Sequence, residues 1–125
     1  MILYNFNESI GIVETTFKGE VSINDIIKYI ISLRENRSTP KKLKIFTNAS
    51  KGEITKKFVP RDLVNLIEEN KTSLAQRDFI YDAFVVSGSL ETALGMLYKE
   101  LIEMDNYKFK IFSTKEAALN WLEKF

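Results

Sequence analysis

The chain has 125 residues, a formal net charge of +1 and 45% hydrophobic residues, and it contains neither cysteine nor histidine. This length and composition are typical of one globular domain, so we predict a single domain over residues 1–125. The missing residue types exclude thiol nucleophiles, imidazole bases and metal sites built from cysteine or histidine. Since no acidic loop resembles a calcium or magnesium site, we expect neither a metal nor a cofactor.

The N-terminal apolar segment, residues 2–6, is too short for a signal peptide, and the polar Asn7 and Glu8 follow it directly. Every other apolar run is far shorter than the roughly 20 residues that span a bilayer. We therefore expect a cytoplasmic protein without a transmembrane segment.

The first part of the chain predicts a β-hairpin followed by a helix. Residues 2–6 and 10–18 are rich in β-branched and aromatic residues, and a polar turn separates them. Gly19 is expected to end the second strand. Residues 22–25 resemble a capping box, and isoleucines at helical spacing follow it, which predicts a helix over residues 23–36.

The middle of the chain alternates strand and helix. Residues 43–47 predict a third strand, and the polar residues 48–52 predict a loop after it. Pro60 suits the first turn of a helix, which leucines and an isoleucine at helical spacing extend to about residue 76. Residues 80–86 predict a fourth strand, whose continuously apolar second half indicates helices on both of its faces.

The last part of the chain continues the alternation. A stripe of inward-facing leucines predicts a helix over residues 90–104, and residues 108–112 alternate as a half-buried strand. Ser113 is expected to cap a final helix that runs to Phe125. The order of elements is ββαβαβαβα, which predicts a single α/β domain with a mixed, mostly parallel five-stranded sheet and four helices.

Ligand sites in such a sheet lie beyond the carboxyl ends of the parallel strands, where helix N-termini also point. Polar segments at 48–52, 87–89 and 113–114 follow three of the predicted strands, and several lysines lie near them. We predict a surface there for a protein partner or a small anion, formed by Asn48, Ser50, Lys51, Lys56, Lys57, Ser87 and Ser89. The alternative interpretation is that the serines are simple helix caps.

Positive charge is concentrated between Arg34 and Arg61, where nine basic residues outnumber two acidic ones. Such a segment attracts phosphate, nucleic acid or an acidic membrane. However, Lys41 and Lys42 precede the third predicted strand and Lys51 follows it, so the basic groups lie at opposite ends of the sheet. Because no nucleic-acid-binding motif accompanies them, we do not expect nucleic acid as a partner.

Four segments carry a resemblance to a known family: residues 13–25, 43–48, 83–87 and, most specifically, 110–122 with Glu-Ala-Ala-Leu-Asn-Trp-Leu at its end. They resemble the SpoIIAA-like proteins, which are related to the STAS domains of anti-sigma-factor antagonists. The resemblance covers nearly the whole chain. It implies a STAS-like fold and a bacterial binding or regulatory module rather than a catalyst.

Anti-sigma-factor antagonists carry a phosphorylatable serine in an Asp-Ser-Ser-Gly-like turn after the strand that matches residues 43–48. The corresponding segment of this chain reads Asn48-Ala49-Ser50-Lys51-Gly52. The resemblance therefore implies Ser50 as the positional candidate for phosphorylation, with Asn48 in place of the acidic residue.

These features together predict a non-catalytic STAS-like regulatory or binding module that acts at the C-terminal ends of the parallel strands. The alternative is a carrier of a lipid or another apolar small ligand, bound between the second helix and the sheet under the 53–60 loop, where Phe58, Val59 and Pro60 form a lid. A small enzyme that uses lysines or carboxylates is a third hypothesis. The apolar edge strand at residues 2–6 also predicts a homodimer.

Overall fold

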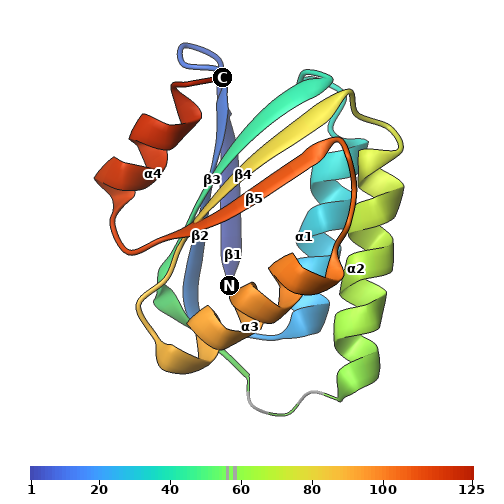
Figure 1. Cartoon of the computed structure of the whole chain (residues 1–125), viewed down its shortest axis with the longest axis vertical. Coiled ribbons are helices and arrows are strands. Elements are labelled where there is room, and N and C mark those ends of the chain that lie inside the picture. The colour runs from blue at the N-terminus through green and yellow to red at the C-terminus, as the bar shows by residue number, and fades with distance from the viewer. Residues whose placement is uncertain (56, 58) are drawn as a thin grey trace.

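Five strands form one sheet in the order β1-β2-β3-β4-β5, with three helices on one face and one helix on the other (Figure 1). The computed structural model describes residues 1–55, 57 and 59–125. The strands are β1 (Ile2–Asn7), β2 (Ile12–Val21), β3 (Lys42–Ile54), β4 (Phe79–Val85) and β5 (Tyr107–Phe112). The helices are α1 (Ile23–Glu35), α2 (Pro60–Leu74), α3 (Ser89–Leu101) and α4 (Lys115–Leu122).

The predicted order ββαβαβαβα and the mixed sheet are confirmed. β1 pairs antiparallel with β2, and the three other strand pairs are parallel. Each parallel strand is connected to its immediate neighbour in the same direction across the sheet. Right-handed crossovers therefore place α1, α2 and α3 on one face, while α4 follows the last strand and covers the other. No helix within the described part of the chain is long and apolar enough to cross a membrane.

The start of α1 follows the predicted capping box. The Asp25 backbone N–H donates to Ser22 Oγ at 3.0 Å, and the Ser22 backbone N–H donates to an Asp25 carboxylate oxygen at 3.0 Å. This hydrogen bond from the Ser22 backbone lowers the pKa of the Asp25 carboxyl, although desolvation opposes it. The two reciprocal bonds satisfy backbone donors that the first turn of a helix leaves free.

The prediction that Gly19 ends the second strand is wrong. β2 continues through Gly19 to Val21, and Gly19 takes a φ of +65°, a conformation that favours glycine. The residue reads as a strand breaker in the sequence because glycine weakens isolated strands. In the sheet, the pairing of β2 with β3 carries the strand past it.

The loop predicted at residues 48–52 is also wrong, because β3 runs through this segment to Ile54. Thr16 pairs with Asn48 and Lys18 pairs with Lys51, so β3 holds one more residue than β2 between these pairs, which is a β-bulge. Asn48 Oδ1 accepts hydrogen bonds from the Ser50 backbone N–H at 3.1 Å and from Ser50 Oγ at 2.6 Å. The polar residues that predict a turn therefore shape a bulge inside a strand.

Two predicted helix starts are displaced by one residue. Gly88 is the N-cap of α3, not Ser87 or Ser89, and Thr114 caps α4 in place of Ser113. Thr114 Oγ1 accepts from the Ala117 backbone N–H at 3.2 Å. Sequence alone does not distinguish neighbouring hydroxyl residues as caps, because each fits the same capping pattern.

The leucine stripe of α3 is only partly buried. The buried residues of this helix are Gly95 and Tyr98, whereas Leu97 and Leu101 are 46% and 50% exposed. The helix ends at Leu101, short of the predicted residue 104. Because the helix carries apolar residues on more than one side, spacing alone does not identify the side that meets the sheet.

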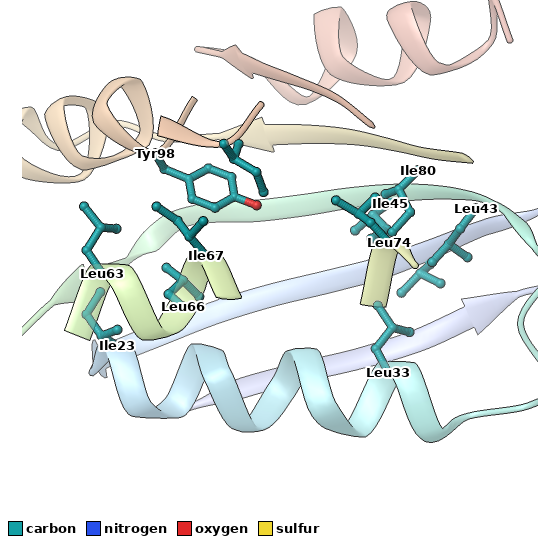
Figure 2. Packing of buried hydrophobic residues seen from close by; sticks show 12 residues of the cluster. Ile23, Leu33, Leu43, Ile45, Leu63, Leu66, Ile67, Leu74, Ile80 and Tyr98 are labelled. Carbon is teal, nitrogen blue, oxygen red and sulfur yellow. The ribbon is translucent and has the colours of Figure 1, made fainter. Parts of the chain in front are cut away.

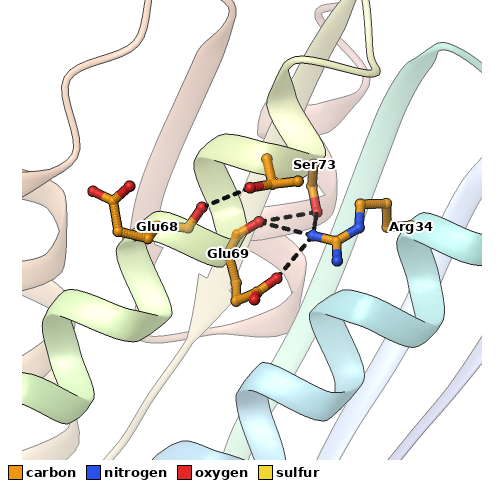
Figure 3. A network of polar contacts seen from close by, with 5 residues as sticks. Arg34, Glu68, Glu69 and Ser73 are labelled. Atoms are coloured by element: carbon orange, nitrogen blue, oxygen red, sulfur yellow. Dashed lines mark hydrogen bonds and ion pairs between the residues drawn. The ribbon is translucent and has the colours of Figure 1, made fainter.

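The sheet separates two packed layers. On the face of α1, α2 and α3, a large apolar cluster joins the three helices to β3 and β4, with Leu43 and Leu74 fully buried (Figure 2). On the opposite face, a smaller cluster joins α4 to the same strands. α1 and α2 are also linked by Arg34, whose Nη1 lies 3.0 Å from a Glu69 carboxylate oxygen and donates to the Glu69 carbonyl oxygen at 3.2 Å (Figure 3).

Candidate functional site

The structure brings three of the predicted strand-end residues together. Asn48 accepts both hydrogen bonds from Ser50, and Ser87 Oγ donates to the Ser50 carbonyl oxygen at 3.0 Å. Asn48 and Ser50 are half-buried on β3, and Ser87 is exposed after β4. The Ser50 hydroxyl proton is thus already donated to Asn48, and these hydrogen bonds stabilise the β3 bulge.

The remaining predicted residues of this surface are more scattered. Lys51, Lys57 and Ser89 are exposed, and among the described residues no hydrogen bond or ion pair joins their side chains to the cluster. Lys56, and Phe58 of the predicted lid, lie outside the described residues. The strand-end surface therefore rests on Asn48, Ser50 and Ser87 among the residues that the structure describes.

A carboxylate occupies the helix terminus nearest this surface. Glu91 in the first turn of α3 accepts a hydrogen bond from the Ile54 backbone N–H at 3.2 Å, and its side chain lies against Gly88. The N-terminus of a helix attracts anions because its free backbone N–H groups and dipole are positive. At α3, the side chain of the protein itself supplies the negative charge.

A largely apolar cavity lies between the sheet and helices α1, α2 and α3, and has a volume of about 130 Å³. Its lining extends along the strands, from Leu43 near the start of β3 to Gly52 near its end. Apolar side chains from the sheet and all three helices form most of its wall, including Ile26, Ile30, Ile45, Leu66, Phe84 and Leu94. Figure 2 shows part of this wall, with Ile45 of β3 and Leu66 of α2 between the sheet and the helices.

Asp82 is an acidic residue in the wall of this apolar cavity. It lies on β4, between Ile45 of β3 and Phe109 of β5, and shares a strand face with Ile80 and Phe84. Its side chain is deep in the molecule, yet Asp82 is only half-buried by exposed area, because it borders the cavity. Burial raises the pKa of the Asp82 carboxyl to about 6, and a hydrogen bond from Tyr107 opposes that rise.

A chain of hydrogen bonds ends on the Asp82 carboxyl. Asn70 Nδ2 donates to Tyr98 Oη, Tyr98 Oη donates to Tyr107 Oη at 2.9 Å, and Tyr107 Oη donates to Asp82 Oδ2 at 2.7 Å. The participating side chains come from α2, α3, β5 and β4, so the chain connects the helical layer to the sheet. Burial raises the pKa of the Tyr98 and Tyr107 hydroxyls above their usual range, and both stay protonated as donors.

A second polar group lies in the same cavity wall. Tyr29 Oη and Thr15 Oγ1 are 2.7 Å apart, and Thr15 is almost fully buried beneath α1. Burial raises the pKa of the Tyr29 hydroxyl, and the nearby negative charge of Asp82 adds to that effect. The cavity thus combines an apolar wall with a few fixed polar groups, as is typical of small-molecule sites.

Sequence reasoning missed Asp82 and the three tyrosines. The available signal was Asp82 itself, since a lone acidic residue in an otherwise apolar strand, expected to be covered on both faces, is rarely buried without a role. The alternation of Ile80, Asp82 and Phe84 could have placed it on a core-facing side. Its tyrosine partners are far from it in the chain, and only the fold brings them together.

No group of three or more acidic residues suited to a metal ion occurs among the residues that the structure describes. The charged or titratable groups that line the cavity are the carboxyls of Asp82 and Glu91, the phenols of Tyr29 and Tyr98, and the guanidinium groups of Arg34 and Arg77. The cavity therefore combines apolar space with the Asp82 carboxyl, a hydrogen-bond acceptor that gains or loses its charge near pH 6.

Comparison with known proteins identifies the fold. No model of a known protein family matches the sequence, and no curated protein is significantly similar to it. The structure is similar to the crystal structure of an uncharacterised protein of the DUF3478 family, with a SpoIIAA-like fold, from Shewanella loihica. The TM-score is 0.62 at 12% sequence identity, and the match covers 97% of this chain and 93% of the other. The predicted SpoIIAA-like fold is therefore confirmed.

Proposed function

We propose that this SpoIIAA-like domain is a non-catalytic binding module that holds a small apolar ligand between its sheet and helices α1, α2 and α3. The observation that carries the proposal is the cavity of about 130 Å³ with its largely apolar wall. Native cores rarely keep such a space, because interiors pack as densely as organic crystals. An apolar cavity of about 150 Å³ is known to stay dry and to bind benzene, so this volume suits a ligand of similar size.

Two contacts favour the cavity over a small-anion site at the strand ends. The Glu91 carboxylate lies at the start of α3 and accepts from Ile54, so an anion there would meet like charge. The Ser50 hydroxyl already donates to Asn48. By contrast, the apolar side chains that line the cavity lack contact partners on one side. A ligand there would gain van der Waals contacts with them and would displace no contact within the protein.

Native mass spectrometry of protein purified from its own host tests this proposal, together with titration by toluene. We expect an added small-molecule mass or saturable toluene binding in the wild type. Leu66→Trp, which fills the cavity from α2, should abolish it, and Leu119→Trp on the half-buried side of α4 should leave it intact. A bare mass with no toluene binding, or equal binding by Leu66→Trp, would contradict the proposal.

A protein partner at the strand ends is the second candidate, favoured by the contact between Ser87 Oγ and the Ser50 carbonyl and by the exposed Lys51 beside them. In this candidate, phosphorylation of Ser50 changes partner binding by placing two negative charges next to Asn48. Affinity capture with Ser50→Asp and with Ser50→Ala tests it. Different partner recovery by the two variants supports the switch, and equal recovery removes it.

We further propose that the module works in the bacterial cytoplasm as a homodimer joined at β1. Leu3 is 50% exposed on this edge strand, and unpaired edges favour association with another chain. Sedimentation of the wild type and of Leu3→Lys tests the dimer. A monomeric wild type, or an unchanged dimer in Leu3→Lys, would exclude this interface.

A further inference from the structure

The Asp82 carboxyl keeps one oxygen available to the cavity. Oδ2 accepts from Tyr107, while no hydrogen bond to Oδ1 is found among the described residues. Within that same part of the chain, no sealed side-chain nitrogen or oxygen atom lacks a partner. Since Asp82 is half-buried and lines the cavity, Oδ1 is therefore open to the cavity space.

The hydrogen-bond chain makes this end of the cavity an acceptor. Tyr98 and Tyr107 each direct their one hydroxyl proton along the chain toward Asp82. Neither tyrosine has a proton left for a ligand, because a phenol carries a single donor. A ligand group placed against Oδ1 must therefore bring its own N–H or O–H.

No positively charged side chain pairs with Asp82 within the described ranges 1–55, 57 and 59–125. Three charged side chains also line the cavity, and each is engaged elsewhere. Arg34 of α1 pairs with Glu69 of α2, Arg77 donates to the carbonyl oxygens of Leu33 and Pro40, and Glu91 of α3 accepts from Ile54. The other titratable groups around the cavity are the phenols Tyr29 of α1, Tyr98 of α3 and Tyr107 of β5.

Resting on the proposed function, we propose that the ligand is a small apolar molecule with a protonated amine, whose ammonium group donates to Asp82 Oδ1. Its apolar body lies among Ile45, Leu66 and Phe84. An ammonium supplies both the donor and the missing positive charge, and charge-assisted hydrogen bonds are about twice as strong as neutral ones. A deep carboxylate without a cation is unfavourable, so the ligand completes a pair that the protein leaves open.

Three probes of nearly equal size separate this inference from the proposed function: benzylamine, benzyl alcohol and ethylbenzene, titrated by calorimetry at pH 7.5. We expect benzylamine to bind at least about tenfold tighter than the other two. Ethylbenzene or benzyl alcohol binding as tightly as benzylamine would overturn the amine inference and leave the apolar site standing. Binding of none of the three would overturn both.

Asp82→Asn and Asp105→Asn form the matched pair of variants. Asp82→Asn keeps the shape of the side chain and removes its charge, so benzylamine binding should fall at least about tenfold while ethylbenzene binding is unchanged. Asp105→Asn makes the same change on an exposed carboxyl that does not line the cavity, and it should keep the preference for the amine. Equal benzylamine binding by Asp82→Asn and the wild type would overturn the inference.

The pH profile provides an independent readout. The amine needs ionised Asp82, whose pKa burial raises to about 6. Benzylamine affinity should therefore fall as the pH drops through 6, whereas ethylbenzene affinity should not. A benzylamine affinity that stays flat between pH 5 and about pH 8 would contradict the ammonium–carboxylate contact.

Discussion

The two faces of the sheet are packed differently, although the same strands contribute to both. On the α4 face, Phe46, Ala83 and Val85 pack with Ala118 and Leu122 into a small apolar cluster, and none of these residues lines the cavity. On the opposite face, three helices enclose a larger cluster that keeps an internal space and a carboxyl group. A face that only needs stability has no reason to retain either feature, so the difference indicates which face is available for a ligand.

Leucine truncation should show the largest contrast between the faces. Leu122→Ala removes a fully buried side chain from the α4 cluster and should lower the free energy of unfolding by about 4 kcal/mol. Leu94→Ala removes a half-buried side chain that already borders empty space, so its loss should be about 1 kcal/mol. Urea denaturation of both variants measures the difference. Equal losses would show that the two faces are packed alike.

Ionisation of Asp82 should make the cavity face less stable at neutral pH. The pKa of this carboxyl is about 6 in the folded protein and 3.8 for an unperturbed aspartate, so the folded state holds the proton more tightly. Its contribution to stability is complete below about pH 4 and is lost as the pH rises through 6. At pH 8, neutral Asp82→Asn should therefore exceed the wild type by about 2 kcal/mol, a gain that vanishes at pH 4.

Chemical denaturation of Asp82→Asn and the wild type at several pH values checks this expectation. Asp25→Asn is a suitable control, because its hydrogen bond with Ser22 lowers the pKa of Asp25. A lowered pKa reverses the sign, so this variant should lose stability above about pH 4 relative to the wild type. A wild type as stable as Asp82→Asn at pH 8 would mean that the ionised carboxyl is well solvated.

Matched alanine-to-valine substitutions probe the space on each face with a smaller effect. Ala83 on β4 is fully buried toward α4, and Ala49 on β3 is 3% exposed and lines the cavity. Ala83→Val should lower the free energy of unfolding by about 1.5 kcal/mol through overpacking. Ala49→Val should stay within about 0.5 kcal/mol of the wild type, because the added methyl groups enter existing space. Thermal unfolding of the two variants measures both losses. Equal losses would mean that there is no free space beside Ala49.

Sequence reasoning recovered the architecture because the signals for it are local. The capping box at Ser22 and Asp25, Pro60 at the start of α2 and the alternation in residues 108–112 each act within a few residues. The order of the elements then restricts the topology to a mostly parallel sheet. These signals place most helices and strands to within a few residues, and the exception is β3, which the sequence predicts to end at residue 47 and which continues to Ile54.

Long-range pairing determined what the sequence left open. Asn48 and Ser50 have the composition of a turn, and only their pairing opposite β2 makes them a bulge. Gly52 follows the bulge because a Cβ there would lie 2.8 Å from Phe17 Cβ, a contact invisible in the sequence. In the same way, the cavity forms where α1, α2 and α3 meet the sheet, and the members of the hydrogen-bond chain that ends on Asp82 come from four separate segments.

The smallest predicted effect separates the carboxyl from the hydrogen bonds that support it. Tyr107→Phe removes the hydroxyl that donates to Asp82 Oδ2. This hydrogen bond lowers the pKa of the carboxyl, so its loss should raise that pKa from about 6 by roughly one unit. Tyr98→Phe leaves that donor in place and should raise the pKa by less, because Tyr98 reaches Asp82 only through Tyr107. Carboxyl carbon chemical shifts, followed by NMR across the titration, give both values. Equal shifts in the two variants would mean that the chain acts as one cooperative unit, and no shift in Tyr107→Phe would mean that the hydration of the cavity sets the charge of Asp82.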